Sequence, residues 1–160
     1  MKRIKQLFTV VATTLILSVT ASAQSRYFQF GNLNQDSVNV TSAWTKLKTT
    51  TGTHSFNKLS GTTKIEVYVN SRFSVGTFSG ANGVRFQVRI DNTIVPTFDN
   101  QGSILKSNTS EFLSIFAVFQ NLPAGNHTVS IWAQAPSGSA SSVTVDPGGW
   151  GGKIIVKETP

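Results

Sequence analysis

The chain contains no cysteine among its 160 residues. This absence excludes disulfide bonds, thiolate metal ligands and anchoring through a lipidated cysteine. A chain that works in an oxidising compartment without a disulfide must be stabilised by its core alone, which is more usual for bacterial proteins than for small secreted animal domains. We therefore expect a bacterial protein whose fold is held together by side-chain packing.

The chain also lacks an apolar run long enough to cross a membrane. Lys2, Arg3 and Lys5 precede apolar residues 7–19, and Ala21-Ser22-Ala23 follows. The apolar run is shorter than the roughly 20 residues of a transmembrane helix, and the three parts together are typical of a secretory signal peptide. We expect residues 1–23 to be cleaved, leaving residues 24–160 as one domain that is secreted, either extracellular or periplasmic, with no membrane span.

Charged residues are few, at 13% of the chain. The predicted leader holds three of the 14 Lys and Arg residues and none of the seven Asp and Glu residues, so the processed chain carries +4 in place of +7. No cluster of Lys and Arg is interleaved with aromatic residues. This pattern argues against a nucleic-acid-binding protein.

Groups that carry catalysis are also scarce. The two histidines, His54 and His127, fall in or beside predicted strands, with no zinc-ligand spacing and no nucleophile motif nearby, so His127 is expected to form local hydrogen bonds. Among the acids, Glu66 falls on the polar face of a predicted strand, and Asp91 and Asp99 fall in turn-like segments, where solvated acids are usual. A pair of the seven acids of the processed chain could nevertheless support glycoside hydrolysis; they are Asp36, Glu66, Asp91, Asp99, Glu111, Asp146 and Glu158. We expect no enzyme and no cofactor, with a small glycan hydrolase as an open alternative.

What the chain does contain is strand and turn residues. Three segments alternate apolar and polar residues, which is the pattern of a strand with one buried face. The inward residues are expected to be Ile65, Val67 and Val69 in residues 63–70, Val84, Phe86, Val88 and Ile90 in residues 84–90, and Val129, Ile131, Ala133 and Ala135 in residues 128–135.

Residues 111–119 differ because they are apolar on both sides of a strand. Three Phe, one Val and one Ile favour a strand buried on both faces over a helix, which is the alternative. Further strands are expected at residues 27–30, 38–48, 55–59, 94–96, 143–145 and 153–158, with Pro96 ending the one at 94–96. About eight to ten short strands separated by turns predict an all-β antiparallel sandwich of jelly-roll type.

Candidate ligand-binding residues lie in one loop and on two strands. Trp150 stands in a loop rich in glycine, and Asp146 precedes it; such an arrangement can stack on a sugar ring and accept its hydroxyls, or bind calcium through oxygen ligands. Trp132, Arg85 and Arg89 fall on the polar sides of their strands. The alternatives are that Trp150 folds back as a lid over the sandwich and that the arginines form an ordinary solvated face.

The end of the chain resembles a known superfamily. It is similar to bacterial and phage jelly rolls of the tumour-necrosis-factor-like and complement globular head type. The similarity lies in the run LPAGNHTVSIWAQAPSGSA and in the terminal GKIIVKE. The matching positions are Ala124, Gly125, His127, Val129 and Ile131. The resemblance implies a non-enzymatic recognition module, often a trimer whose last strand packs at the threefold axis. We expect a module that binds a glycan or cell-surface ligand, or alternatively a structural subunit of an extracellular assembly or matrix.

Overall fold

The computed structural model describes residues 24–31, 33, 37–47 and 54–160. The predicted leader lies outside this part. All regular elements within it are β-strands, twelve in number, and they form two antiparallel sheets. No helix of the described residues is long and apolar enough to span a membrane.

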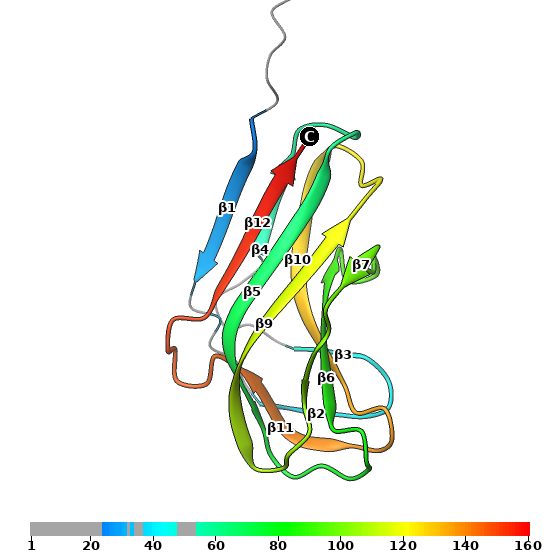
Figure 1. Ribbon diagram of the computed structural model, residues 1–160, viewed down its shortest axis with the longest axis vertical. Coiled ribbons are helices and arrows are strands. Elements are labelled where there is room, and N and C mark those ends of the chain that lie inside the picture. Colours follow the sequence, from blue (N-terminus) through cyan, green and yellow to red (C-terminus); the bar gives the residue numbers. More distant parts are fainter. Residues whose placement is uncertain (1–23, 32, 34–36, 48–53) are drawn as a thin grey trace, which may run out of the picture.

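The larger sheet has seven strands and is built around the long strand β5 (Figure 1). Along one edge β5 pairs with β12 and, near its end, with β11; along the other edge it pairs with β9 over nearly its whole length. β1 extends the sheet beyond β12, β7 beyond β9, and β2 beyond β11. The strands are β1 (Arg26–Gly31), β2 (Val38–Val40), β5 (Lys64–Val75), β7 (Phe98–Asp99), β9 (Thr109–Phe119), β11 (Ala140–Val145) and β12 (Lys153–Thr159).

The smaller sheet has five strands with β10 at its centre. β6 pairs with β10 along one edge, and β8 lies beyond β6. Along the other edge, β4 pairs with the first half of β10 and β3 with the second half. The strands are β3 (Thr45–Lys46), β4 (His54–Lys58), β6 (Val84–Ile90), β8 (Gly102–Ile104) and β10 (Gly125–Gln134).

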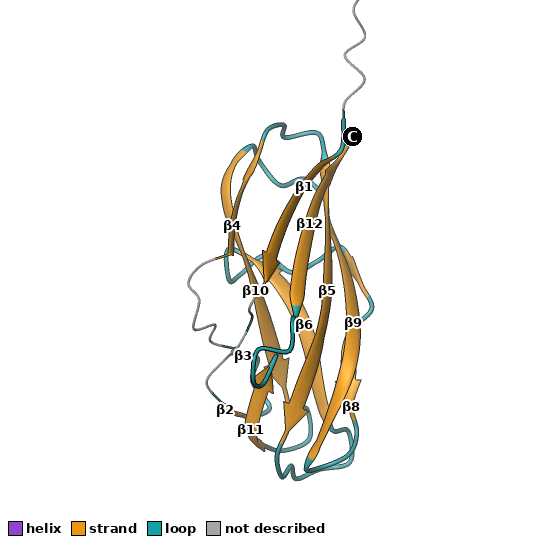
Figure 2. Ribbon diagram, turned by 90° about the vertical axis from the view of Figure 1, so that its left-hand side faces the viewer, coloured by secondary structure: helices purple, strands orange, loops and turns teal. Residues whose placement is uncertain are grey.

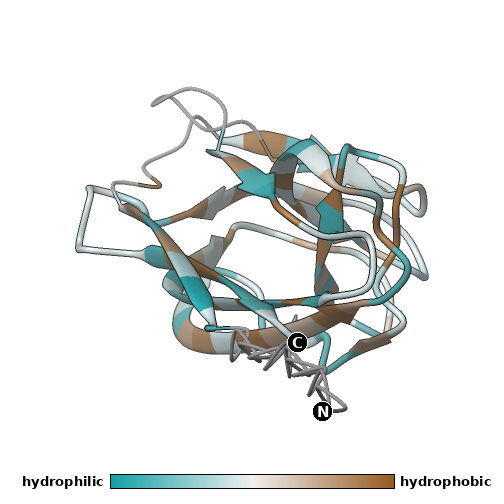
Figure 3. Cartoon of the chain, turned by 90° about the horizontal axis from the view of Figure 1, so that it is seen from above, coloured by the Kyte–Doolittle hydropathy of each residue, from teal (hydrophilic) through white to brown (hydrophobic). Residues whose placement is uncertain are grey.

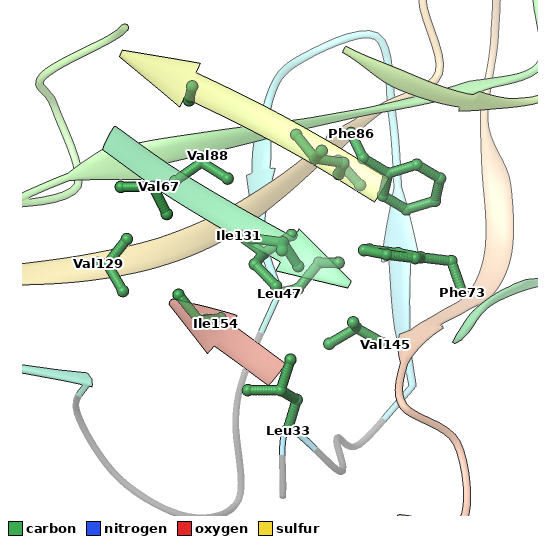
Figure 4. Close-up of a cluster of buried hydrophobic side chains, with 14 of the residues drawn as sticks. Leu33, Leu47, Val67, Phe73, Phe86, Val88, Val129, Ile131, Val145 and Ile154 are labelled. Atoms are coloured by element: carbon green, nitrogen blue, oxygen red, sulfur yellow. The ribbon is translucent and has the colours of Figure 1, made fainter. Parts of the chain in front are cut away.

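The two sheets pack face to face, and the core lies between them (Figures 2 and 3). The inward side chains of the three alternating segments are 4% exposed or less, as the alternation predicts. Figure 4 shows Phe73 from β5 against Phe86 from β6, and their ring centroids are 4.6 Å apart. The expected all-β antiparallel sandwich is confirmed.

Several predicted boundaries were wrong. The expected strand at residues 94–96 is reduced to a single bridge between Ile90 and Ile94, because Asp91 and Asn92 adopt positive φ angles of 49° and 65° and turn the chain tightly. The expected strand at 38–48 is divided into β2 and β3. β5 continues past Asn70 to Val75. The described residues form twelve strands, more than the predicted eight to ten, and the short strands β7 and β8 were not predicted.

β9 is a strand, but the prediction that both of its faces are buried was wrong. Ile115, Ala117 and Phe119 point into the core and are at most 1% exposed. Phe116 and Val118 lie on the opposite face and are only partly buried. The outer side of β9 is therefore an apolar surface that its own fold covers only in part.

Candidate functional site

Trp150 lies in the loop that joins β11 to β12, which projects from the side of the sandwich (Figure 1). Its side chain is 70% exposed, so it does not fold back as a lid. Gly148, Gly149 and Gly151 have φ angles of 81°, 70° and 90°, a region that favours glycine. A Cβ atom at Gly148 would lie 2.8 Å from Nε1 of Trp150, so this glycine also makes room for the ring.

Asp146, at the start of the same loop, is fully buried. Its backbone N–H donates to the carbonyl of Arg72 at 2.7 Å, and its own carbonyl accepts from the N–H of Gly149 at 3.0 Å. Neither carboxylate oxygen has a hydrogen-bond partner among the described residues. The exposed Trp150 and the buried Asp146 therefore do not present one shared surface to a ligand, although both were predicted to belong to one site.

Replacing Asp146 by asparagine is expected to stabilise the fold by about 2 kcal/mol at neutral pH. A buried carboxylate without partners is costly, and an amide of the same shape carries no charge. Asparagine also tolerates the φ of 51° at this position. Urea unfolding of the wild type and Asp146→Asn measures the difference; a less stable variant would contradict the argument. If Asp146 binds calcium, millimolar calcium will raise the urea concentration at which half of the wild type is unfolded. It will leave this midpoint unchanged in Asp146→Asn.

A second candidate region lies on the outer face of the five-stranded sheet. Here the guanidinium of Arg89 is 4.6 Å from the centroid of the Trp132 ring and 5.2 Å from that of the Trp44 ring. We call Trp44, Arg89 and Trp132 the Trp–Arg cluster. Two of its members were expected at the site. Trp44 was missed, because it comes from the poorly patterned segment before β3 and reaches Arg89 only through the pairing of β3 with β10.

Hydrogen bonds hold the Trp–Arg cluster in place. Nε of Arg89 donates to Oε1 of Gln87 at 3.1 Å, and Nε2 of Gln87 donates to Oδ2 of Asp99 at 3.0 Å. Nε1 of Trp132 donates to Oγ of the buried Ser130 at 2.9 Å. Burial lowers the pKa of Arg89 below its ordinary value.

Arg85 lies on the same outer face, four residues before Arg89 on β6. Its side chain is exposed, and no carboxylate among the described residues forms an ion pair with it. Lys46 is directly opposite Trp132 in the pairing of β3 with β10 and is also exposed. This face therefore combines two indole rings with three cations.

The third candidate region is the outer face of the seven-stranded sheet. Rows of paired residues run across β12, β5, β9 and β7 and place apolar side chains beside one another. The rings of Tyr68 and Phe116 are 4.8 Å apart, and those of Phe98 and Phe116 are 6.2 Å apart. We define the outer aromatic face as Tyr68, Phe98, Phe116, Val118 and Ile155.

Glu66 lies within this face, beside Tyr68, and is only 8% exposed. Its carboxylate is 2.9 Å from Nζ of Lys64 and 3.7 Å from Nζ of Lys157, and it accepts a hydrogen bond from the hydroxyl of Tyr68 at 3.2 Å. The hydrogen bond from Lys64 is the main cause that lowers the pKa of Glu66 below its usual value. Burial acts in the opposite direction and would raise the pKa. The charge is thus neutralised within the face.

The histidines and several acids have structural roles. The ring of the buried His127 is 2.7 Å from Oδ2 of Asp91 and 3.0 Å from the carbonyl of Pro123, so both of its nitrogens are engaged, in line with the expected local hydrogen bonds. Burial, followed by the charge of Lys46, lowers the pKa of His54, whose ring packs edge-on against Phe30 at 5.1 Å. In the part of the chain that the structure covers, no three His, Asp or Glu residues lie close enough together to hold a metal ion.

Comparisons with known proteins give little guidance. No protein-family model matches the sequence, and no curated protein matches it; no catalytic family is therefore found. Among solved structures, the fold is similar to the tripod (BppUct-A-L) from the baseplate of bacteriophage Tuc2009, with a TM-score of 0.47 and 13% sequence identity. The match covers 99% of this chain and 76% of the tripod chain. At this level the likeness assigns neither a family nor a function.

Proposed function

We propose that the protein is a structural subunit of an extracellular assembly, in which copies of the chain associate through the outer aromatic face. The observation that carries this proposal is the apolar outer side of β9, flanked by Tyr68 on β5 and Phe98 on β7. The predicted leader supports a location outside the cytoplasm.

The composition of β9 supports a partner on its outer side. A strand with one solvated face normally carries polar residues on that face, whereas Phe116 and Val118 stand there in β9. Phe98, beside Val118, is 59% exposed. Contiguous apolar surfaces of this kind are typical of protein–protein interfaces, where their burial supplies the driving force for association.

The electrostatics of the face are compatible with burial between copies. A buried charge is costly unless it is paired. Glu66, the acid within the face, already has Lys64 and Lys157 as partners from its own chain. Association would therefore leave no unpaired carboxylate at this position, and its two ion pairs would gain strength in a drier environment.

The stoichiometry that we propose is three. The superfamily that the last third of the sequence resembles implies a trimer in which the last strand packs near the threefold axis. In this chain the last strand, β12, contributes Ile155 to the outer aromatic face, directly opposite Tyr68. A closed ring of three copies also buries the face without leaving a free end that would continue into a filament.

Replacing Phe116 by aspartate is expected to separate the copies. A charge at the centre of the face must be desolvated on association, and central aromatic residues commonly contribute about 2 kcal/mol or more to an interface, which corresponds to a dissociation constant raised about thirtyfold or more. Size-exclusion chromatography with light scattering measures the mass of each variant over a range of concentrations. The wild type is expected at three times the monomer mass, and the variant at the monomer mass.

The control is Leu105→Asp, because Leu105 is an exposed apolar residue, at 69%, that follows β8 in the other sheet. It should leave the mass unchanged. Phe98→Asp repeats the test at a more exposed position, where folding is least at risk. A wild type that stays monomeric at every concentration, or a Phe116→Asp variant that keeps the wild-type mass, would refute self-association through this face.

A second candidate function is recognition of a glycan or cell-surface ligand. The Trp–Arg cluster favours it, because indole rings that are partly exposed can stack on sugar rings. The exposed Trp150 offers a further ring on the β11–β12 loop. The cluster lies on the opposite side of the sandwich from the outer aromatic face, so the two functions are compatible. Screening on a glycan array tests it, and a protein that binds no glycan would contradict this candidate.

A further inference from the structure

We propose that the Trp–Arg cluster is a receptor for the carboxylate groups of an acidic polysaccharide, with Arg89 binding the carboxylate and Trp44 and Trp132 contacting the sugar rings. This inference rests on the second candidate function, recognition of a glycan, and adds to it the chemical class of the ligand.

The first argument is that Arg89 has no anionic partner among the described residues. The ion pairs of the described residues join Arg26 to Glu158, Lys64 and Lys157 to Glu66, and His127 to Asp91. Asp99, the acid nearest in the hydrogen-bond chain, is bound to the amide of Gln87 and does not contact Arg89 within 4 Å. The positive charge of Arg89 is therefore not neutralised by the described part of the protein.

The second argument is that the guanidinium is held in a defined position. The two indole rings lie within 4.6 and 5.2 Å of it, and its Nε donates to Gln87. Only Nε has a hydrogen-bond partner among the described residues, so the terminal Nη groups keep their donors. A planar group with two adjacent N–H donors matches the two oxygens of a carboxylate. Because the side chain is already ordered, binding would cost little additional entropy.

The third argument is the chemistry around the cluster. Arg85 and Lys46 add positive charge on the same face, and the cluster sits on the outer surfaces of β6, β10 and β3. Indole rings offer flat apolar surfaces that suit the C–H faces of sugars. A polymer that repeats a sugar ring and a carboxylate meets both requirements, whereas a neutral glycan would leave the guanidinium unpaired.

Isothermal titration calorimetry with polygalacturonate tests the proposal, and the same polymer with its carboxyl groups methyl-esterified is the matched control. We expect the wild type to bind polygalacturonate at least tenfold more tightly than the ester, and the affinity to fall as salt increases. Equal affinity for the two polymers would overturn the assignment of a carboxylate.

The variant Arg89→Lys keeps the charge but loses the planar fork, so its affinity for polygalacturonate should fall at least tenfold. Arg72→Lys makes the same change on β5, in the other sheet, and should leave the affinity unchanged. Circular dichroism and thermal unfolding confirm that both variants fold. An Arg89→Lys variant that binds as tightly as the wild type would refute the role of Arg89.

Two further polymers identify the anion. If dextran sulfate binds more tightly than polygalacturonate, the preferred ligand group is a sulfate and not a carboxylate. If duplex DNA binds more tightly than polygalacturonate, the ligand is a nucleic acid. Either result overturns the proposal. Light scattering of Arg89→Lys should give the wild-type mass, because Arg89 lies away from the outer aromatic face. Failure of the polysaccharide assay and failure of self-association are therefore separate results.

Discussion

Replacing Phe73 by alanine is expected to lower the free energy of unfolding by about 4 kcal/mol, the range for removing a large aromatic side chain from a core. Phe73 is fully buried near the end of β5, and its ring meets that of Phe86 from the opposite sheet at 4.6 Å. The alanine variant loses this contact and leaves a cavity between the two sheets. Each strand is hydrogen-bonded to its neighbours in its sheet, so one strand cannot move alone to fill the cavity. Urea unfolding measures the loss.

Phe112→Ala is the matched control for this substitution. Phe112 lies on β9, in the same sheet, but its side chain is 76% exposed, so the same change removes little buried surface. The free energy of unfolding should change by less than about 1 kcal/mol. Equal losses for the two variants would show that Phe73 does not occupy the core position described for it.

Replacing Glu158 by alanine is expected to cost a similar amount, about 4 kcal/mol, because it removes the buried acceptor of several hydrogen bonds and leaves their donors unpaired. The carboxylate of Glu158 is 4% exposed. It accepts hydrogen bonds from the hydroxyl of Thr63 at 2.6 Å and from the backbone N–H groups of Leu59 and Ser60 at 3.1 and 3.2 Å. These bonds tie the β4–β5 connection, which joins the two sheets, to the last strand. Without the carboxylate, two backbone donors lose their partner.

The loss should depend on pH. Burial alone would raise the pKa of Glu158, but the hydrogen bonds from Thr63, Leu59 and Ser60 outweigh it and hold the pKa below its usual value. A carboxyl group with a lowered pKa in the folded state stabilises the fold above its unfolded pKa, near 4.3, and this stabilisation disappears as the pH falls through the folded pKa. The difference between wild type and Glu158→Ala should therefore be largest above about pH 5 and shrink in acid.

Glu111→Ala provides the comparison for the pH profile. Glu111 is exposed on β9, so its removal should change stability little at any pH. A gap between wild type and Glu158→Ala that stays constant from pH 7 to pH 3 would show that the ionised carboxylate is not what stabilises this part of the fold.

The sequence reveals only part of the candidate sites. It indicated Arg85, Arg89 and Trp132, because the alternation of apolar and polar residues shows which side chains of a strand point away from the core. It did not indicate Trp44, which lies 45 residues before Arg89 and meets it only because β10 pairs with both β3 and β6. It also joined Asp146 to Trp150 because they lie in one loop, whereas in the structure Asp146 is fully buried and Trp150 is 70% exposed.

By itself, the sequence determined the fold class, the faces of the clearest strands and the absence of thiol chemistry, since these follow from local alternation and composition. Only the tertiary structure decided which segments pack against each face of a strand. β9 has apolar residues on both sides, and its sequence predicts that both are covered; whether the cover comes from the same chain depends on how the strands pair and how the sheets stack. Those contacts join residues far apart in the sequence, and no local pattern records them.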